Sequence, residues 1–200
     1  MEGTCIKHRF ASSSIKMYDK HGCVLRIETT INDVSFFKHH RKVEHRQGPP
    51  TRGLAPVKKT ICSLLDLREI MLGCNRRYLA HLAALDDFSA SVRALDRLTK
   101  PRTVEQKTLK ESTSLTRSIA LLHALQNPRV NIAGIRRADL LPLLDQLFPD
   151  RLSRQLRRLR DLGVIKRVAR TYSYYLTRIG RAATAALCRI TQTVIIPALA

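Results

Sequence analysis

Apolar residues recur at spacings of three and four along much of the chain, a pattern that predicts amphipathic helices. The longest such run covers 61–99. Shorter runs and their flanking residues predict four further helices in the last part of the chain. These helices are expected at 115–125, 135–147, 151–162 and 178–193. The chain is therefore expected to be mainly α.

Three shorter segments have the composition of strands rather than helices. Residues 15–31 predict a β-hairpin whose turn ends at Gly22, a residue that adopts positive φ easily. Residues 164–170 and 171–176 predict two short strands that follow the helix at 151–162. Small β elements are thus expected at both ends of the chain.

The predicted helix at 151–162 has two contrasting faces. Leu152, Leu156 and Leu159 fall within about 60° of one another at 100° per residue, so this side is expected to pack on a core. The arginines of the opposite half are Arg151, Arg154, Arg157 and Arg158. Such a face is either merely solvated or a nucleic-acid contact, because guanidinium groups bind phosphate and guanine in a bidentate manner.

The order of the predicted elements is helix, helix, short turn, basic helix, two-stranded hairpin, helix. This order predicts a winged helix-turn-helix, in which the basic helix enters the major groove and the hairpin reaches the DNA backbone. The expected fold class is mainly α with small β elements, with this C-terminal winged helix-turn-helix preceded by a β-hairpin and a helical segment. The expected DNA-binding residues are Arg151, Ser153, Arg154, Arg157, Arg158, Lys166, Arg167, Arg170, Thr171 and Tyr172.

Composition divides the chain into four stretches. The four stretches are a basic β-hairpin segment at 1–60, a helical segment at 61–99, a polar linker at 100–114 and the winged helix DNA-binding domain at 115–200. Because the chain opens abruptly before a predicted strand, we also expect it to be a truncated form of a longer protein.

The segment DRLSRQLRRLRDLGVIKRVARTYSYYLTRIGR resembles the recognition helix, wing and following helix of MarR-like winged helix regulators. The matching marks are the L-x-x-L-x-x-L-G-x-I spacing that begins at Leu156 and the L-T-x-x-G-R ending at Arg181. The whole chain also resembles the C-terminal part of bacterial proteins of undetermined role that are often labelled MarR-family regulators. The resemblance implies transcription regulation and a homodimer as a candidate state, and it leaves any effector ligand unknown.

The charge balance strengthens the expectation of a polyanionic partner. The chain of 200 residues carries 36 Lys and Arg against 16 Asp and Glu, a net charge of +20. Neutralising phosphates with such a surplus releases counterions and drives binding. No apolar run of about 18 residues is present, so no membrane partner is expected. Five scattered cysteines indicate free thiols, so a cytoplasmic, nucleoid-associated location is expected.

The N-terminal stretch allows a second interpretation. Lys16, Tyr18 and Asp19 stand in a segment that faintly resembles a strand pair of plasmid and phage replication initiators, in which a tyrosine attacks a phosphodiester. Glu28 and Asp19 are more readily explained as ion-pair partners of neighbouring basic residues. The histidines of this stretch have no carboxylate or thiol at a recognised metal-binding spacing, so they are expected on a basic surface loop; they include His39, His40 and His45.

The sequence therefore predicts a protein that binds double-stranded DNA, a winged helix transcriptional regulator that reads duplex DNA with the helix at 151–162 and the wing at 164–176. It is not expected to be an enzyme, and no catalytic residue, metal or cofactor is expected. One alternative is a fragment of a plasmid- or phage-type replication or recombination protein whose winged helix docks a larger catalytic unit. A second alternative is an RNA-binding basic protein.

Overall fold

A computed structural model describes residues 5–86, 93–94, 102–104, 107–109, 119–144, 149–169 and 171–195. The chain divides into two compact units, unit 1 at Met1–Arg77 and unit 2 at Tyr78–Ala200. Among the helices of these described ranges, none combines the length and the apolar character needed to cross a membrane.

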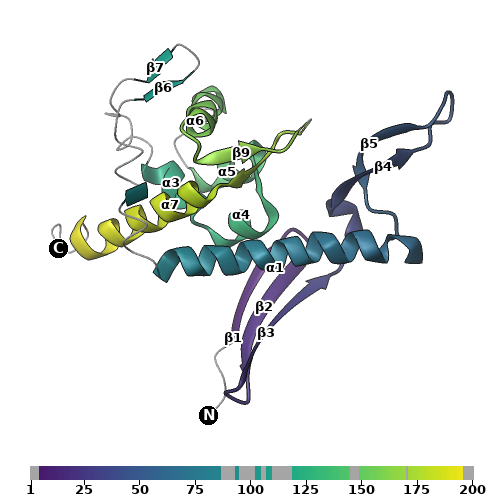
Figure 1. Ribbon diagram of the computed structural model, residues 1–200, viewed down its shortest axis with the longest axis horizontal. Helices are drawn as coiled ribbons and strands as arrows, with labels where there is room; N and C mark the ends of the chain where they lie inside the picture. Colours follow the sequence, from purple (N-terminus) through teal and green to yellow (C-terminus); the bar gives the residue numbers. More distant parts are fainter. Residues whose placement is uncertain are drawn as a thin grey trace. The chain divides into compact units, whose positions relative to one another are not determined.

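Unit 1 begins with an antiparallel sheet of three strands in the order β1-β2-β3 (Figure 1). The predicted hairpin at 15–31 is part of it, because Met17 pairs with Ile27 across β2 and β3. Phe10 and Ile15 are fully buried, and the turn uses positive φ at both His21 and Gly22. Val24, the first residue of β3, follows this turn and is exposed. The strands are β1 at Cys5–Phe10, β2 at Ser13–Lys20 and β3 at Val24–Ile31.

The rest of unit 1 consists of a separate two-stranded ribbon and the first part of a long helix. The ribbon strands β4 and β5 pair only with each other among the described strands. α1 covers part of the range expected to be helical. The elements are the 3₁₀ turn η1 at Val34–Phe36, β4 at Lys38–Val43, β5 at Thr51–Pro56, the 3₁₀ turn η2 at Ile61–Ser63 and α1 at Leu64–Asp86.

Unit 2 combines short helices with two small sheets. Its first strands, β6 at Arg102–Val104 and β7 at Lys107–Leu109, form a hairpin within the range expected to be a linker, and the rest of that range lies outside the described residues. A three-stranded sheet has the order β8-β10-β9. The other elements are α3 at Ile119–Leu125, α4 at Pro128–Ala133, β8 at Ile135–Arg136, α5 at Arg137–Leu140, the 3₁₀ turn η4 at Leu141–Leu143, α6 at Pro149–Asp161, β9 at Ile165–Arg167, β10 at Ser173–Leu176, α7 at Arg178–Ile190 and the π-helical turn η5 at Thr191–Ile195.

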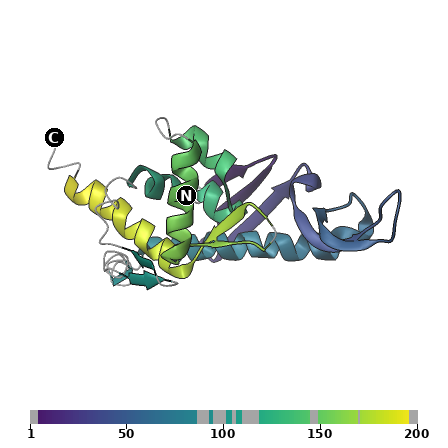
Figure 2. The same ribbon diagram turned by 90° about the horizontal axis from the view of Figure 1, so that it is seen from above.

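The core of unit 2 lies under α6 and beside α3 and α7. The predicted buried face of α6 is confirmed, because Leu152, Leu156 and Leu159 are at most 4% exposed. α3 packs against α7, as Figures 1 and 2 show. Gly180 lets α7 approach the main chain of Val164, where an added Cβ would lie 2.9 Å from the carbonyl carbon. The start of β9 is therefore held directly against α7.

The predicted fold class is wrong in two respects. The protein is not mainly α, because an antiparallel sheet and a β ribbon occupy most of residues 5–56. A C-terminal winged helix-turn-helix is not what the structure shows either. The single helix expected at 135–147 is replaced by β8, α5 and η4, and β8 joins the expected two-stranded hairpin to make three strands.

The chain around Gly134 explains why no continuous helix forms there. Gly134 has a φ of +90°, and a Cβ at this position would lie 2.8 Å from Tyr175 Cε1. The chain therefore leaves α4 in an extended direction and pairs Ile135 with Tyr174 of β10. Pro142 then falls in the 3₁₀ turn η4, and since proline lacks an N–H it cannot continue a helix from α5.

Candidate nucleic-acid interface

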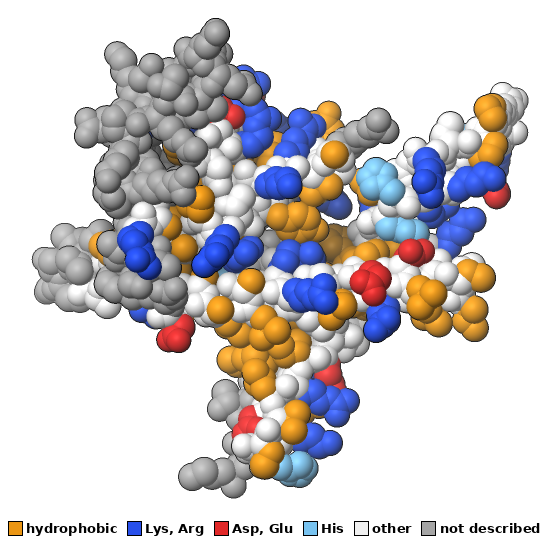
Figure 3. All heavy atoms as spheres, viewed as in Figure 1, with side chains coloured by type: hydrophobic (Ala, Val, Ile, Leu, Met, Phe, Trp, Pro, Cys, Tyr) orange, Lys and Arg blue, Asp and Glu red, His pale blue; other side chains and the backbone are white. Residues whose placement is uncertain are grey.

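α6 places a row of arginines on the exposed side of unit 2. Burial of its leucines leaves the opposite half of the helix in solvent, as the sequence predicts. Arg151, Arg154 and Arg157 are exposed and Arg158 is partly exposed. Blue Lys and Arg side chains gather over α6 and β9 on the face shown in Figure 3. The local sequence at 128–182 holds 13 Lys and Arg against four Asp and Glu, a net charge of +9.

Four of the α6 arginines have no counter-charge in the part of the chain that the structure describes. The side chains of Arg151, Arg154, Arg157 and Arg158 make no hydrogen bond or ion pair with any described residue. Arg160, by contrast, lies 3.3 Å from the Asp161 carboxylate. Like charges within one or two turns of a helix repel each other, so an external anion would stabilise this arrangement.

A groove of about 610 Å³ runs between α5, α6 and the β9–β10 pair. Its lining contains no Asp or Glu among the described residues. Arg137 Nη1 donates a 3.1 Å hydrogen bond to Ser153 Oγ, which ties α5 to α6 at this place. Leu156, Tyr172 and Tyr174 supply apolar surface between the charges. The arginines that line the groove are Arg136, Arg137, Arg157, Arg160 and Arg167.

The tip of the β9–β10 pair is ordered by its own polar contacts. Arg167 Nε donates a 2.6 Å hydrogen bond to the Thr171 carbonyl, and its Cζ lies 5.4 Å from the centre of the Tyr172 ring. Thr171 Oγ1 in turn donates to the Val168 carbonyl at 3.0 Å. Tyr172 is 82% exposed, so one face of an aromatic ring beside a guanidinium is presented to solvent.

The structure brings most of the expected DNA-binding residues together on unit 2. Ser153, Arg157, Arg167 and Tyr172 line the groove. Lys166 is exposed on β9, next to the groove residue Arg167. Four of the remaining expected residues lie on α6 or at the β9–β10 tip, and Arg170 lies outside the described residues. The four are Arg151, Arg154 and Arg158 on α6 and Thr171 at the tip.

We name the exposed arginines of α6, the groove and the β9–β10 tip together the basic surface. Sequence reasoning missed Arg160 of α6, as well as two arginines outside that helix, Arg136 and Arg137, which were assigned to the start of a helix expected at 135–147. They reach the groove only because Arg136 pairs with Ser173 of β10, a contact between residues 37 positions apart. The consecutive arginines after a glycine were the only local signal.

The N-terminal residues considered for catalysis form a surface hydrogen-bond network instead. Tyr18 Oη donates a 2.9 Å hydrogen bond to Glu28 Oε1, and Arg26 Nε lies 2.8 Å from the same oxygen. The hydrogen bond to Glu28 raises the pKa of the Tyr18 phenol above its ordinary value. Glu28 is the ion-pair partner that the sequence predicts.

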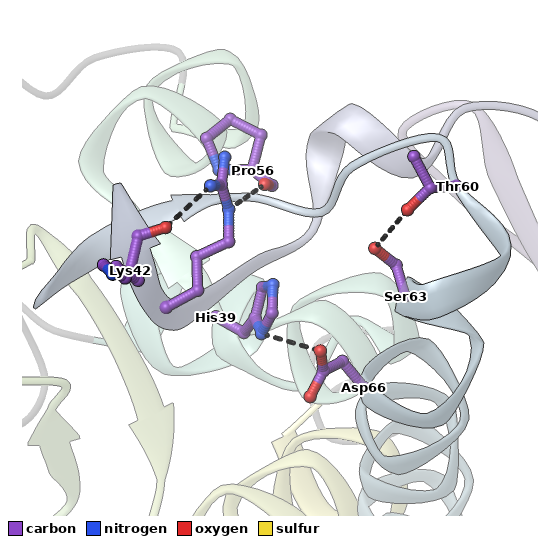
Figure 4. A network of polar contacts seen from close by, with 7 residues as sticks. His39, Lys42, Pro56, Thr60, Ser63 and Asp66 are labelled. Atoms are coloured by element: carbon purple, nitrogen blue, oxygen red, sulfur yellow. Dashed lines mark hydrogen bonds and ion pairs between the residues drawn. The ribbon is translucent and has the colours of Figure 1, made fainter. Parts of the chain in front are cut away.

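Two histidines of unit 1, His39 and His45, make structural contacts. His39 and His40 belong to β4 rather than to a loop, and His39 Nδ1 lies 3.4 Å from Asp66 Oδ2 of α1 (Figure 4). His45 Nε2 lies 2.8 Å from Thr51 Oγ1. Within the described ranges, no three His, Cys, Asp or Glu side chains are grouped so that they could hold a metal ion.

Comparison with known proteins adds no relative to this description. No protein-family model matches the chain, and no curated protein or solved structure matches it either.

Proposed function

We propose that this protein binds double-stranded DNA through the basic surface of unit 2. The observation that carries the proposal is the accumulation on α6 of arginines that have no counter-charge among the described residues. They lie beside a groove lined by five arginines, of which Arg157 and Arg160 also belong to α6. A polyanion is the partner that relieves this repulsion, because each neutralised phosphate also releases condensed counterions.

The shape of the basic surface supports duplex DNA as the polyanion. The major groove of B-DNA is about 12 Å wide and admits one α-helix. One side of α6 carries Arg151, Arg154 and Arg158 at spacings of three and four, so these side chains lie along one line of the helix. Arginine is also the side chain that most often reads guanine in a bidentate manner.

The groove and the tip supply a second kind of contact within the same surface. Arg167 is held by the Thr171 carbonyl and Lys166 is exposed next to it, so both cations sit on a fixed strand rather than on a loop. Such contacts bind phosphate and position a protein on the duplex without reading its sequence. We therefore assign base reading to α6 and backbone binding to β9.

The proposal is tested by selecting bound duplexes from a random pool at about 150 mM salt and by titrating the selected duplex against single variants. We expect Arg154→Gln to weaken the selected site by about 1–3 kcal/mol and to relax its sequence preference. Lys166→Gln should weaken all duplexes equally and lower the slope of log affinity against log salt by about 1. Arg129→Gln is the matched control, because Arg129 is exposed on α4 and lines no part of the groove.

The outcomes separate the candidate partners. Enrichment of one motif would support a regulator that reads the DNA sequence. Equal losses in all three variants would show that the charge acts without a localised site and would overturn the assignment to α6. Preference for an A-form RNA duplex over the same sequence as B-DNA would replace DNA with RNA as the partner, because the deep, narrow major groove of RNA does not admit α6.

A further inference from the structure

The β4–β5 ribbon of unit 1 has two faces with opposite environments. In an antiparallel pair, residues that face each other across the strands lie on the same side, and the side alternates with each residue. His39 faces Ala55 on one side, whereas Lys42 faces Arg52 on the other. The two sides of the ribbon therefore carry different sets of side chains.

The first side is occupied by contacts within unit 1. His39 is bound to Asp66 at 3.4 Å, and Ala55 is only 8% exposed. Arg41 Nε donates to the Pro56 carbonyl at 3.1 Å and Nη1 donates to the Lys42 carbonyl at 3.2 Å, which holds this guanidinium along the ribbon. These contacts fix which side of the ribbon points away from the unit.

The second side is basic, exposed and unpaired. Lys38, His40, Lys42 and Arg52 are all exposed, and none has a side-chain hydrogen bond or ion pair with a described residue. Lys42 and Arg52 are direct cross-strand partners, an arrangement of like charges that destabilises a β pair. In Figure 3 blue Lys and Arg and pale blue His side chains gather over the ribbon.

The charge balance of the whole ribbon has the same sign. Residues 38–56 contain five Lys and Arg, three His and one acidic residue, Glu44. The like-charge pair and the surplus of basic residues are not required by the fold of the ribbon, because its stabilising contacts lie on the other side. They are the features of a surface that meets a polyanion.

We propose that this outward side of the ribbon, with Lys38, His40, Lys42 and Arg52, is a second contact for the phosphate backbone of duplex nucleic acid. A two-stranded ribbon is one of the two elements that the major groove of B-DNA admits, the other being an α-helix. The site lies in unit 1 and is distinct from the basic surface of unit 2. The inference rests on the proposed function for the identity of its partner.

The first test removes the like-charge pair from the full chain. Lys42→Gln/Arg52→Gln is compared with Lys7→Gln/Lys20→Gln, which removes the same charge from exposed positions of the three-stranded sheet. We expect the ribbon variant to weaken duplex binding at 150 mM salt by roughly tenfold and to lower the slope of log affinity against log salt by about 2. The control should retain the slope of the unmodified protein.

The second test uses the unmodified protein, so a folding defect in a variant cannot affect its result. Lysine acetylation of the unmodified protein is measured by mass spectrometry with and without duplex. Lys38 and Lys42 should be protected by the duplex, whereas Lys7 and Lys20 should react as they do in free protein. Protection of Lys42 by vesicles of anionic phosphatidylserine, but not by duplex, would overturn the inference in favour of a membrane surface.

The outcomes of these tests distinguish a failure of the ribbon site from a failure of the proposed function. If the unmodified protein fails to bind duplex at all, the proposed function fails and the ribbon site fails with it. If duplex binding is lost in Arg154→Gln while the ribbon variant behaves as its control and Lys42 remains unprotected, only the ribbon inference is wrong.

Discussion

Replacing Gly180 by alanine tests the close contact between α7 and the start of β9. An added Cβ would lie 2.9 Å from the Val164 carbonyl carbon and 3.0 Å from Leu176 Cδ2, and it would come closer still to the Val164 carbonyl oxygen. That same oxygen accepts the Thr177 N–H at 3.0 Å, so it cannot move without loosening the beginning of α7. The obstacle is main chain rather than the end of a flexible side chain.

The expected magnitude is the difference between two opposing effects. Alanine is more favourable than glycine inside a helix by about 1 kcal/mol. Overpacking costs typically about 1–3 kcal/mol and occasionally more. Because a backbone carbonyl must shift, we expect the upper end of this range at Gly180 and a net loss of about 2 kcal/mol.

The same substitution at Gly73 supplies the matched control. Gly73 lies inside α1, and its added Cβ would meet only the end of the Arg77 side chain, at 3.1 Å from Nη1. Since this guanidinium can move aside, Gly73→Ala should raise the free energy of unfolding by about 0.4–1 kcal/mol. The two variants are thus expected to have opposite signs.

Both variants are measured by urea unfolding followed by circular dichroism at 222 nm, with thermal melting as a second observation. A loss of 2 kcal/mol corresponds to about 4–8 °C in melting temperature for a chain of this size. The Gly180 variant should also bind duplex more weakly, because β9 carries Lys166 and Arg167. A Gly180→Ala protein as stable as the Gly73→Ala protein would refute the contact between α7 and Val164.

Three further changes probe the core, a helix cap and a buried thiol. Leu152→Ala removes a fully buried side chain and should lower the free energy of unfolding by about 2–5 kcal/mol in urea titrations, and a normal midpoint would place this leucine outside the core. Thr177→Ala removes the N-cap of α7 together with a 2.6 Å hydrogen bond to the Gly163 carbonyl and should cost about 1–2 kcal/mol, whereas Thr177→Ser should retain most of the stability. Burial raises the pKa of the Cys74 thiol, so iodoacetamide at pH 8 should modify exposed Cys62 well before Cys74, and equal rates would contradict the burial. Because the pKa of Cys74 is raised only in the folded chain, the unfolded chain loses this proton at a lower pH than the folded chain does. The contribution of this thiol to stability should therefore decline as the pH rises above its ordinary pKa of 9.0.

The elements that could be predicted from the sequence are those whose signal is local. The leucine spacing of α6 is complete within four turns, and Thr177 begins α7 with a side chain that accepts the Gly180 N–H. The β9–β10 pair lies within a few residues of its turn, so its two strands were also visible. For the same reason most of the basic surface could be identified in advance.

Two kinds of element could not be predicted: a strand that forms only because it pairs with a distant part of the chain, and a strand composed mainly of charged residues. β8 has two residues, too few to show a period, and it exists because it pairs with β10. The residues of β4, KHHRKV, include only one large apolar side chain, so the alternation between inward and outward positions is carried by charged and imidazole side chains. Such a strand has no hydrophobic pattern, and only the pairing of His39 with Ala55 reveals its register.

The open edge of the three-stranded sheet has a consequence for the behaviour of concentrated samples. β3 presents Val24 and Leu25, which are 56% and 62% exposed, and on one side it pairs with no other described strand. Unprotected edges of this kind promote pairing between copies and aggregation. A net charge of +20 opposes the approach of two copies over a Debye length of about 10 Å at 0.1 M salt, which shrinks to about 3 Å at 1 M. Colloidal stability should therefore decrease as salt is added, because the screened charge no longer keeps these edges apart.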